Sequence, residues 1–305
     1  MTGSAQSAIT VIGSINTDMV VKTQSLPSAG ETVMGGNFFM SGGGKGGNQA
    51  VAAARLGATV SMVANLGMDT LGDTAIGRLQ AEGIDCKFVS RDEHQASGVA
   101  LISVDAGGEN HIVVAPGANA TLSSKHVEEA FSQIEPSSLI LLQLEIPMDA
   151  VSRAAELSAK KGCRLILDPA PAQELSASLM ASTYLITPNE TEAEILTGIR
   201  VVDEASAREA ATQLLAVGVE NVAITLGKQG VFLANNEASQ FIPSLAVDAV
   251  DTTAAGDCFN GSLAAALAKG GSLPDSIKFA CKAASIAVTR LGAQDSMPYA
   301  REIEM

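Results

Sequence analysis

The alternation of short apolar runs with amphipathic stretches constrains this chain most. Runs of four to six aliphatic residues recur along it, and between them lie segments with apolar residues at three- and four-residue spacing. Parallel strands need helical crossovers of this kind, so we predict an α/β fold with a doubly wound, mostly parallel sheet flanked by helices. The predicted strands are residues 9–13, 59–64, 139–142, 164–167, 184–186 and 222–225, and the clearest helices are residues 48–56, 205–216 and 275–290.

The composition favours one aliphatic core. With 29 Gly, 8 Phe, 2 Tyr and no Trp, the core must consist mainly of Ala, Val, Leu and Ile. A compact chain of about 300 residues buries roughly three quarters of its unfolded surface, so it needs no disulfide staples. No repeat or Pro-rich linker divides the sequence, and we predict a single domain over residues 1–305.

Charge and targeting signals exclude several classes of protein. The net charge of -14 argues against a nucleic-acid partner, which usually meets a basic face. The longest apolar runs fall short of the ~18 residues that span a membrane, and residues 1–8 carry no basic residue of a signal or transit peptide. The four cysteines are far apart and are interpreted as free thiols. We therefore expect a soluble cytoplasmic protein without a membrane partner.

Two pairs of extended segments interrupt the alternation. Residues 19–21 pair with 32–39 in this interpretation, and residues 98–104 pair with 111–115 across a turn-forming segment, 105–110. Strands without an intervening helix do not easily join a parallel sheet. We predict a small antiparallel β lid, discontinuous in sequence, over roughly residues 15–24, 32–41 and 97–116, which would exclude water from a site below it. The alternative is a β-meander that extends the main sheet.

A glycine cluster, S-G-G-G-K-G-G-N-Q-A at residues 41–50, opens the first helix. Glycine lets the backbone approach a ligand, and a helix N-terminus offers free N–H groups. A dinucleotide loop would need a preceding strand, but residues 37–41 have little strand character, and no Ser or Thr follows Lys45 as in a Walker A loop. A flexible turn is the alternative, although Lys45 and Asn48 favour polyol or phosphate binding.

The segment D-T-T-A-A-G-D-C-F-N-G, residues 251–261, precedes a helical run. Small residues there create a nest of backbone N–H groups, and the helix dipole favours a carboxylate in the first turn. A nest beside an acid suits phosphoryl transfer, because the nest holds the moving charge while the acid accepts the alcohol proton. The alternative is an ordinary capped helix with Asp257 as a first-turn acid.

Together these two segments resemble the two signatures of the ribokinase family of carbohydrate kinases, in the expected order. Residues 13–18, 27–32, 189–192, 225–230 and 288–293 match further stretches of that family, so the resemblance covers essentially the whole chain. It implies an ATP-dependent kinase that phosphorylates the 5-hydroxyl of D-ribose, with Mg²⁺ and K⁺ as cofactors. Independently of the resemblance, a lid with an apolar outer face would bind a second copy, so we expect a homodimer through the lid.

The resemblance also implies roles for individual residues. Asp257 would be the catalytic base, and the backbone N–H groups of Ala254, Ala255 and Gly256 would form the anion hole. Sugar-binding positions would be Asn16, Asp18, Gly43, Gly44, Lys45, Asn48 and Glu145, together with Asp257. Nucleotide-binding positions would be Asn189, Thr225, Leu226, Gly227, Lys228, Gln229, Gly230, Gly256, Asp257 and Cys281.

Both metal sites rest on the same resemblance. Glu192, which with Asn189 is expected in the first turn of a helix, would hold Mg²⁺ through water, as Mg²⁺ usually keeps several waters. From composition alone, a solvated helix face is the alternative for Glu192. The implied K⁺ ligands, largely carbonyl oxygens, are Asp251, Thr253, Ala287, Arg290, Gly292 and Ser296.

Three rival functions differ in what they explain. A related kinase could act on deoxyribose, fructose or a nucleoside, and Cys281, where relatives commonly have His or Asn, puts nucleotide preference in doubt. A catalytically silent sugar-binding protein would explain the glycine cluster but not residues 251–257. A nicotinamide oxidoreductase would need a glycine-rich loop after the first strand, and residues 13–16 do not form one.

Overall fold

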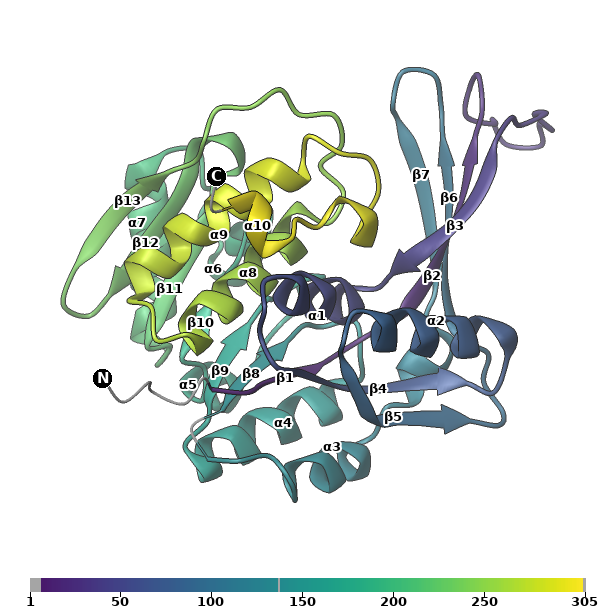
Figure 1. The fold of residues 1–305 in the computed structure, drawn as a ribbon. Helices are drawn as coiled ribbons and strands as arrows, with labels where there is room; N and C mark the ends of the chain where they lie inside the picture. The colour runs from purple at the N-terminus through teal and green to yellow at the C-terminus, as the bar shows by residue number, and fades with distance from the viewer. Residues whose placement is uncertain (1–6, 137, 304–305) are drawn as a thin grey trace.

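A computed structural model describes residues 7–136 and 138–303. The prediction that residues 1–8 contain no signal or transit peptide therefore falls mostly outside the described residues. Its centre is a nine-stranded sheet in the order β13-β12-β11-β10-β9-β8-β1-β4-β5 (Figure 1). Pairing is parallel from β11 to β5, whereas β12 and β13 are antiparallel. The strands are β1 (Ile9–Ile12), β4 (Val60–Gly67), β5 (Asp85–Asp92), β8 (Leu139–Leu142), β9 (Arg164–Leu167), β10 (Leu185–Ile186), β11 (Asn221–Thr225), β12 (Gly230–Asn235) and β13 (Ser239–Pro243).

Helices cover both faces of this sheet, which confirms the doubly wound architecture (Figure 1). One apolar cluster includes residues of α1 (Lys45–Arg55), α2 (Thr70–Ala81), α8 (Ala255–Ala268), α9 (Leu273–Ala287) and α10 (Ala300–Ile303). The other includes residues of α3 (Ser124–Phe131), α4 (Met148–Lys161), α5 (Ala177–Ala181), α6 (Glu190–Thr197) and α7 (Glu204–Ala216). Central strands such as β1 and β8 are apolar at nearly every position because both of their faces are buried. Within the described residues, no helix is long and apolar enough to cross a membrane.

A second, four-stranded sheet forms the lid and projects from the main body (Figure 1). It consists of β2 (Asn16–Lys22), β3 (Phe38–Gly43), β6 (Gly98–Val104) and β7 (Asn110–Ala115), in the order β3-β2-β6-β7. The prediction of a separate lid is therefore confirmed, and the alternative, a β-meander that extends the main sheet, is wrong. Its outer pairs, β2 with β3 and β6 with β7, are antiparallel as predicted, whereas β2 and β6 at the centre run parallel.

The strand boundaries near the glycine cluster also differ from the prediction. Residues 32–37 form no strand, whereas residues 38–43 do, and they lead through Gly44 into α1. Pairing of β3 with β2, from Asn16↔Gly43 to Val21↔Phe38, imposes extended backbone on residues 41–43, whose Ser-Gly-Gly sequence has low intrinsic strand propensity. A strand does precede the glycine turn, but it belongs to the lid.

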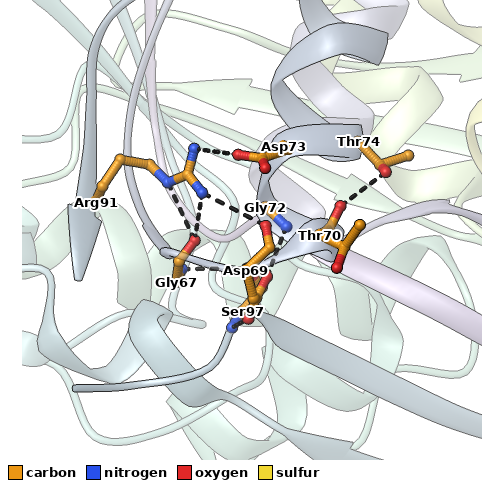
Figure 2. A network of polar contacts seen from close by, with 8 residues as sticks. All are labelled: Gly67, Asp69, Thr70, Gly72, Asp73, Thr74, Arg91 and Ser97. Carbon is orange, nitrogen blue, oxygen red and sulfur yellow. Dashed lines mark hydrogen bonds and ion pairs between the residues drawn. The ribbon is translucent and has the colours of Figure 1, made fainter. Parts of the chain in front are cut away.

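The lid joins the main body through a compact polar junction (Figure 2). Asp69 caps α2, and its carboxylate accepts hydrogen bonds from Gly72 N at 2.8 Å and from both N and Oγ of Ser97 at 2.8 Å. Ser97 immediately precedes β6. Nearby, the Arg91 guanidinium donates to the Gly67 carbonyl at 3.0 and 2.8 Å, which joins β5 to the end of β4. These contacts fix the point where the chain enters the second half of the lid.

We predict that Asp69→Ala lowers the free energy of unfolding by roughly 1–3 kcal/mol in urea titrations at pH 7. The substitution removes a helix cap and leaves the N–H of buried Ser97 without its acceptor. Hydrogen bonds from Ser97 and Gly72 outweigh desolvation and lower the pKa of Asp69. Its stabilising effect is therefore complete above the unfolded-state pKa and is lost as the pH falls through the folded-state value.

Asp203→Ala is the matched control, because the Asp203 carboxylate accepts from N and Oγ of Ser206, both within the helix that it caps. Asp69 in addition accepts from Ser97, which lies outside its helix. It should cost less stability than Asp69→Ala at pH 7. Equal losses for the two variants would show that the Ser97 contacts add nothing to the cap.

Candidate active site

The predicted site residues gather beyond the carboxyl ends of the parallel strands, where open α/β sheets commonly bind ligands. Two helices begin there. α1 starts after Gly44, whose φ of 82° suits glycine, and α8 starts after Ala254, whose φ of 57° is unusual for a residue with a side chain. The two helices pack against each other, so side chains in the first turns of both converge.

Asp257 is the centre of this convergence and is almost completely buried. Asn48 Nδ2 donates to its Oδ2 at 2.8 Å, and Gln49 Nε2 donates to its Oδ1 at 3.0 Å. Burial raises the pKa of Asp257, while the Lys45 ammonium and these two amides act in the opposite direction. The arrangement holds a carboxylate with one donor on each oxygen and leaves further lone pairs on both.

The N-terminus of α8 offers backbone N–H groups beside this carboxylate. Within the described part of the chain, the N–H groups of Ala254, Gly256 and Asp257 have no protein acceptor. The N–H of Ala255 differs from the expectation, because it donates to the Thr252 carbonyl at 3.2 Å in the turn that starts the helix. The free N–H groups and the helix dipole suit a bound anion.

The predicted sugar positions come from both the lid and the main body. Asp18 on β2 lies against Gly43 on β3, where a Cβ atom would collide with the Asp18 carboxylate. Glu145 Oε2, beyond β8, accepts hydrogen bonds from Ser14 Oγ at 2.5 Å and from Lys45 N at 3.1 Å. These residues therefore line one polar region near Asp257.

Charge coupling confirms how close these groups lie. Desolvation, followed by the Glu145 and Asp257 carboxylates, raises the pKa of Asp18 to about 6. Burial by itself would lower the pKa of Lys45, but Asp257, Asp168, Glu145 and Glu192 together raise it above its ordinary value. One ammonium thus faces several carboxylates in a partly desolvated space.

Asn16 is held at the base of the lid. Its Oδ1 accepts from Asn119 Nδ2 at 2.8 Å, while Asn119 Oδ1 accepts from Ile15 N at 2.9 Å. Asn119 lies in η1 (Gly117–Thr121), a short 3-10 turn after β7. Because the Asn16 oxygen is occupied, its NH₂ group is the part left for a ligand.

A cavity of about 470 Å³ lies beside the start of α8. Of the predicted nucleotide positions, those that line it are Asn189, Thr225, Gly227, Lys228, Gly230, Gly256 and Cys281. Leu226 and Gln229 do not line it; their backbones close the turn of η2 (Gly227–Gln229), and Leu226 is buried. Sequence reasoning missed the remaining wall, which includes residues 244–247, Phe259 and Ser285.

Asn189 and Glu192 form a reciprocal cap at the start of α6, as their expected place in a first turn predicts. Asn189 Oδ1 accepts from Glu192 N at 2.8 Å, and Glu192 Oε2 accepts from Asn189 N at 2.9 Å. Burial raises the pKa of Glu192. Among the described residues, no cluster of three or more His, Cys, Asp or Glu side chains could hold a metal, so a metal here would depend on water or bound phosphate.

The predicted K⁺ positions come together where two loops meet. Asp251 Oδ1 accepts from Thr253 N and Oδ2 from Gly292 N, both at 2.9 Å. The Arg290 guanidinium instead pairs with Glu302 at 2.6 Å, and Ser296 Oγ donates to the Ala293 carbonyl. The Ala287 carbonyl accepts from Arg290 N at 3.0 Å. Backbone oxygens are therefore the groups these positions could contribute to a cation.

Sequence reasoning missed the buried polar groups behind Asp257. Gln49 follows Asn48 in α1, and Gln143 and Asp168 directly follow the predicted strands of residues 139–142 and 164–167. Their positions just beyond buried strands were the available signal. For Gln49, a second signal was its place directly after Asn48, which was already a predicted site residue.

Several known proteins are similar to this chain in sequence or in structure. The profile described as "pfkB family carbohydrate kinase" matches residues 6–300. The chain is 46% identical to a ribokinase of Haemophilus influenzae, covering 96% of each chain, and 38% identical to a deoxyribokinase of Salmonella typhi, covering 95% of each. It is also similar to the structure of Arabidopsis thaliana ribokinase complexed with ribose and ATP, with a TM-score of 0.89, 30% identity and coverage of 98% and 97%.

The structural similarity extends along nearly the whole length and so includes both the main sheet and the lid. The chain therefore belongs to the pfkB family of carbohydrate kinases.

Proposed function

We propose that this kinase transfers the γ-phosphoryl group of ATP to the 5-hydroxyl of D-ribose, and that residues 1–305 act as one domain. The observation that carries the proposal is the position of Asp257. It lies between a cavity lined by the nucleotide positions and a polar region of carboxylates and amides at the lid. The relatives that are ribokinases support ribose as the acceptor.

The mechanism follows from the groups around Asp257. Its carboxylate accepts the 5-hydroxyl proton as the sugar oxygen bonds to the γ-phosphorus and the bond from phosphorus to the β,γ-bridging oxygen breaks. ADP is the leaving group. The free N–H groups of Gly256 and Asp257 and the α8 dipole stabilise the charge on the transferred group.

Two cations complete the proposal. Mg²⁺ would be held by water near Glu192 and would neutralise phosphate charge, which suits a site without a cluster of three or more ligating side chains among the described residues. K⁺ would be held by oxygens of Asp251, Thr253, Ala287, Arg290, Gly292 and Ser296, next to the turn that starts α8. Among the described residues no disulfide joins the cysteines, which supports a reducing, cytoplasmic setting for the enzyme.

Deoxyribose is the second candidate acceptor, because a deoxyribokinase is 38% identical to the chain. The two sugars differ in one hydroxyl. A site built to bind that hydroxyl discriminates strongly, because its absence leaves buried polar groups unpaired. The buried carboxylate of Asp18 and the amides of Asn16 and Asn48 favour the sugar with more hydroxyls.

We predict that purified protein with Mg²⁺-ATP releases ADP fastest with ribose, more slowly with deoxyribose, fructose or adenosine, and faster when K⁺ replaces Na⁺. A coupled ADP-release assay measures each rate. Faster turnover on another acceptor would replace ribose as the substrate while leaving the mechanism in place.

Asp257→Asn is the matched control for that assay. It keeps the size of the side chain and loses the base, so kcat should fall about 100- to 10,000-fold. Ribose affinity by calorimetry should change little. A near-normal kcat would remove Asp257 from the role of base.

We predict that ribose binding weakens as the pH falls below about 6, since the pKa of Asp18 is raised to about 6. Above that pH the carboxylate accepts sugar hydroxyls through both oxygens, and protonation removes its charge and one acceptor. Calorimetry without ATP should show this loss in wild type and in Asp257→Asn. Asp18→Asn should bind weakly at every pH from 5 to 7.5, and an unchanged acid dependence in that variant would assign the titration to another group.

We also propose that two copies associate through the lid. A row of apolar side chains crosses all four strands at Met40, Met19, Leu101 and Val113, which are register neighbours. Leu101 is 51% exposed and Val113 65% exposed. Such a continuous exposed apolar surface is typical of an interface.

Val113→Glu should convert a dimer into a monomer in sedimentation velocity experiments. Val202, 61% exposed on the main body, offers a control of equal chemistry in Val202→Glu. A dimer that survives Val113→Glu, or a wild-type protein that is monomeric at micromolar concentration, would exclude this interface.

A further inference from the structure

Gln49 is fully buried behind the proposed base, and all of its amide groups are occupied. Its Nε2 donates to Asp257 Oδ1 at 3.0 Å and to Asp168 Oδ2 at 2.7 Å, while its Oε1 accepts from Gln143 Nε2 at 2.6 Å. We propose that Gln49, held by Gln143 and Asp168, is a positioning residue that fixes the carboxylate of Asp257 for proton transfer. This inference rests on the proposed kinase function.

The surrounding groups determine which way the Gln49 amide faces. If the amide were rotated by 180°, its oxygen would lie against two carboxyl groups and its NH₂ against the NH₂ of Gln143. The first contact would be repulsive toward an ionised Asp257, and the second would set two donors against each other. The Gln143 donor and the Asp257 acceptor therefore select one orientation. One NH₂ group thus provides one N–H to each acid.

Gln49, Gln143 and Asp168 all belong to the main body of the molecule. Gln143 directly follows β8, Asp168 directly follows β9, and Gln49 is the fifth residue of α1. Each is at most 5% exposed. Hydrogen bonds through Gln49 therefore connect the Asp257 carboxylate to the ends of β8 and β9. No lid residue belongs to this set of contacts among the described residues.

The two donors to Asp257 are consecutive residues with different roles in this scheme. Asn48, at an expected sugar position, donates to Oδ2, and Gln49 donates to Oδ1. With both oxygens restrained, rotation of the carboxylate is blocked, and the remaining lone pairs point in fixed directions. Removing Gln49 leaves one oxygen of a buried carboxylate without its donor.

The charges around Asp257 come from several elements. Lys45 of α1 favours its ionised form, whereas Glu145, beyond β8, disfavours it. Asp168 couples to Lys45, Asp257 and Glu192, and burial raises its own pKa well above the ordinary value. Asn keeps an oxygen acceptor at this position and lacks the carboxyl group that titrates, which makes it an informative replacement.

The test compares Gln49→Met, which keeps the length of the side chain but removes its hydrogen bonds, with wild type. With protein carrying ¹³C-labelled Asp carboxyl groups, the Asp257 signal is assigned by its absence in Asp257→Asn. Loss of a charge-assisted hydrogen bond should raise the apparent pKa of Asp257 by about one unit and lower kcat roughly 10- to 100-fold. KM for both substrates should stay within about threefold, and the acid limb of the kcat profile should move with the NMR titration.

Asp168 supplies the rescue experiment. Asp168→Asn keeps an oxygen acceptor for Gln49 and should retain kcat within about threefold, whereas Asp168→Ala should fall roughly tenfold. Asn221→Leu is the control for lost stability, because it removes a buried amide at the start of β11. It should lower the melting temperature and leave kcat unchanged. Melting temperatures of all variants separate unfolding from altered chemistry.

Each alternative result would overturn the inference. An unchanged Asp257 titration in Gln49→Met, or a raised Mg²⁺ requirement in Asp168→Asn, would exclude positioning through this amide. Wild-type protein without turnover on any sugar would overturn the proposed function instead, and the positioning role with it. The carboxyl titration in the same samples distinguishes these two failures.

Discussion

The close approach of α1 and α8 is the contact on which the site depends. At Gly261 a Cβ atom would collide with the Gln49 carbonyl, and Ala52 lies at the same crossing. At Gly46 the start of α1 packs on the backbone of Gly13, again without room for a side chain. Because small residues form both contacts, the first turns of the two helices come within hydrogen-bond distance and join Asn48 and Gln49 to Asp257.

The site consequently has a fixed side and a side built on the lid. The main body contains the cavity lined by the predicted nucleotide positions, the start of α8, and the polar groups behind Asp257. Asp18, Gly43 and Asn16 belong to the lid or its base. A sugar bound between them would contact both sides, whereas the groups that handle the proton stay on the sheet and its helices.

Sequence predicted the parts whose signal is local. β8 and β9 were predicted to the residue because strands buried on both faces are short continuous apolar runs. β5 and β13 were missed, since edge strands with mixed burial lack that run. β3 was misplaced because its extended backbone depends on pairing with β2. The glycine and small-residue clusters indicated where α1 and α8 begin. Gln49, Asp168 and Asn119 were missed, because their hydrogen-bond partners are distant in the sequence and a single buried polar residue has no characteristic spacing.

The lid leaves the main body as two separate excursions of the chain, one between β1 and α1 and the other between β5 and α3. Each begins and ends at residues anchored to the sheet, including Ser97 and Asn119. The outward strands can therefore accumulate substitutions, or change in length, without altering the backbone that carries Asp257. A fold with this connectivity separates the part of the chain that can vary in length and sequence from the part that holds the buried groups around Asp257.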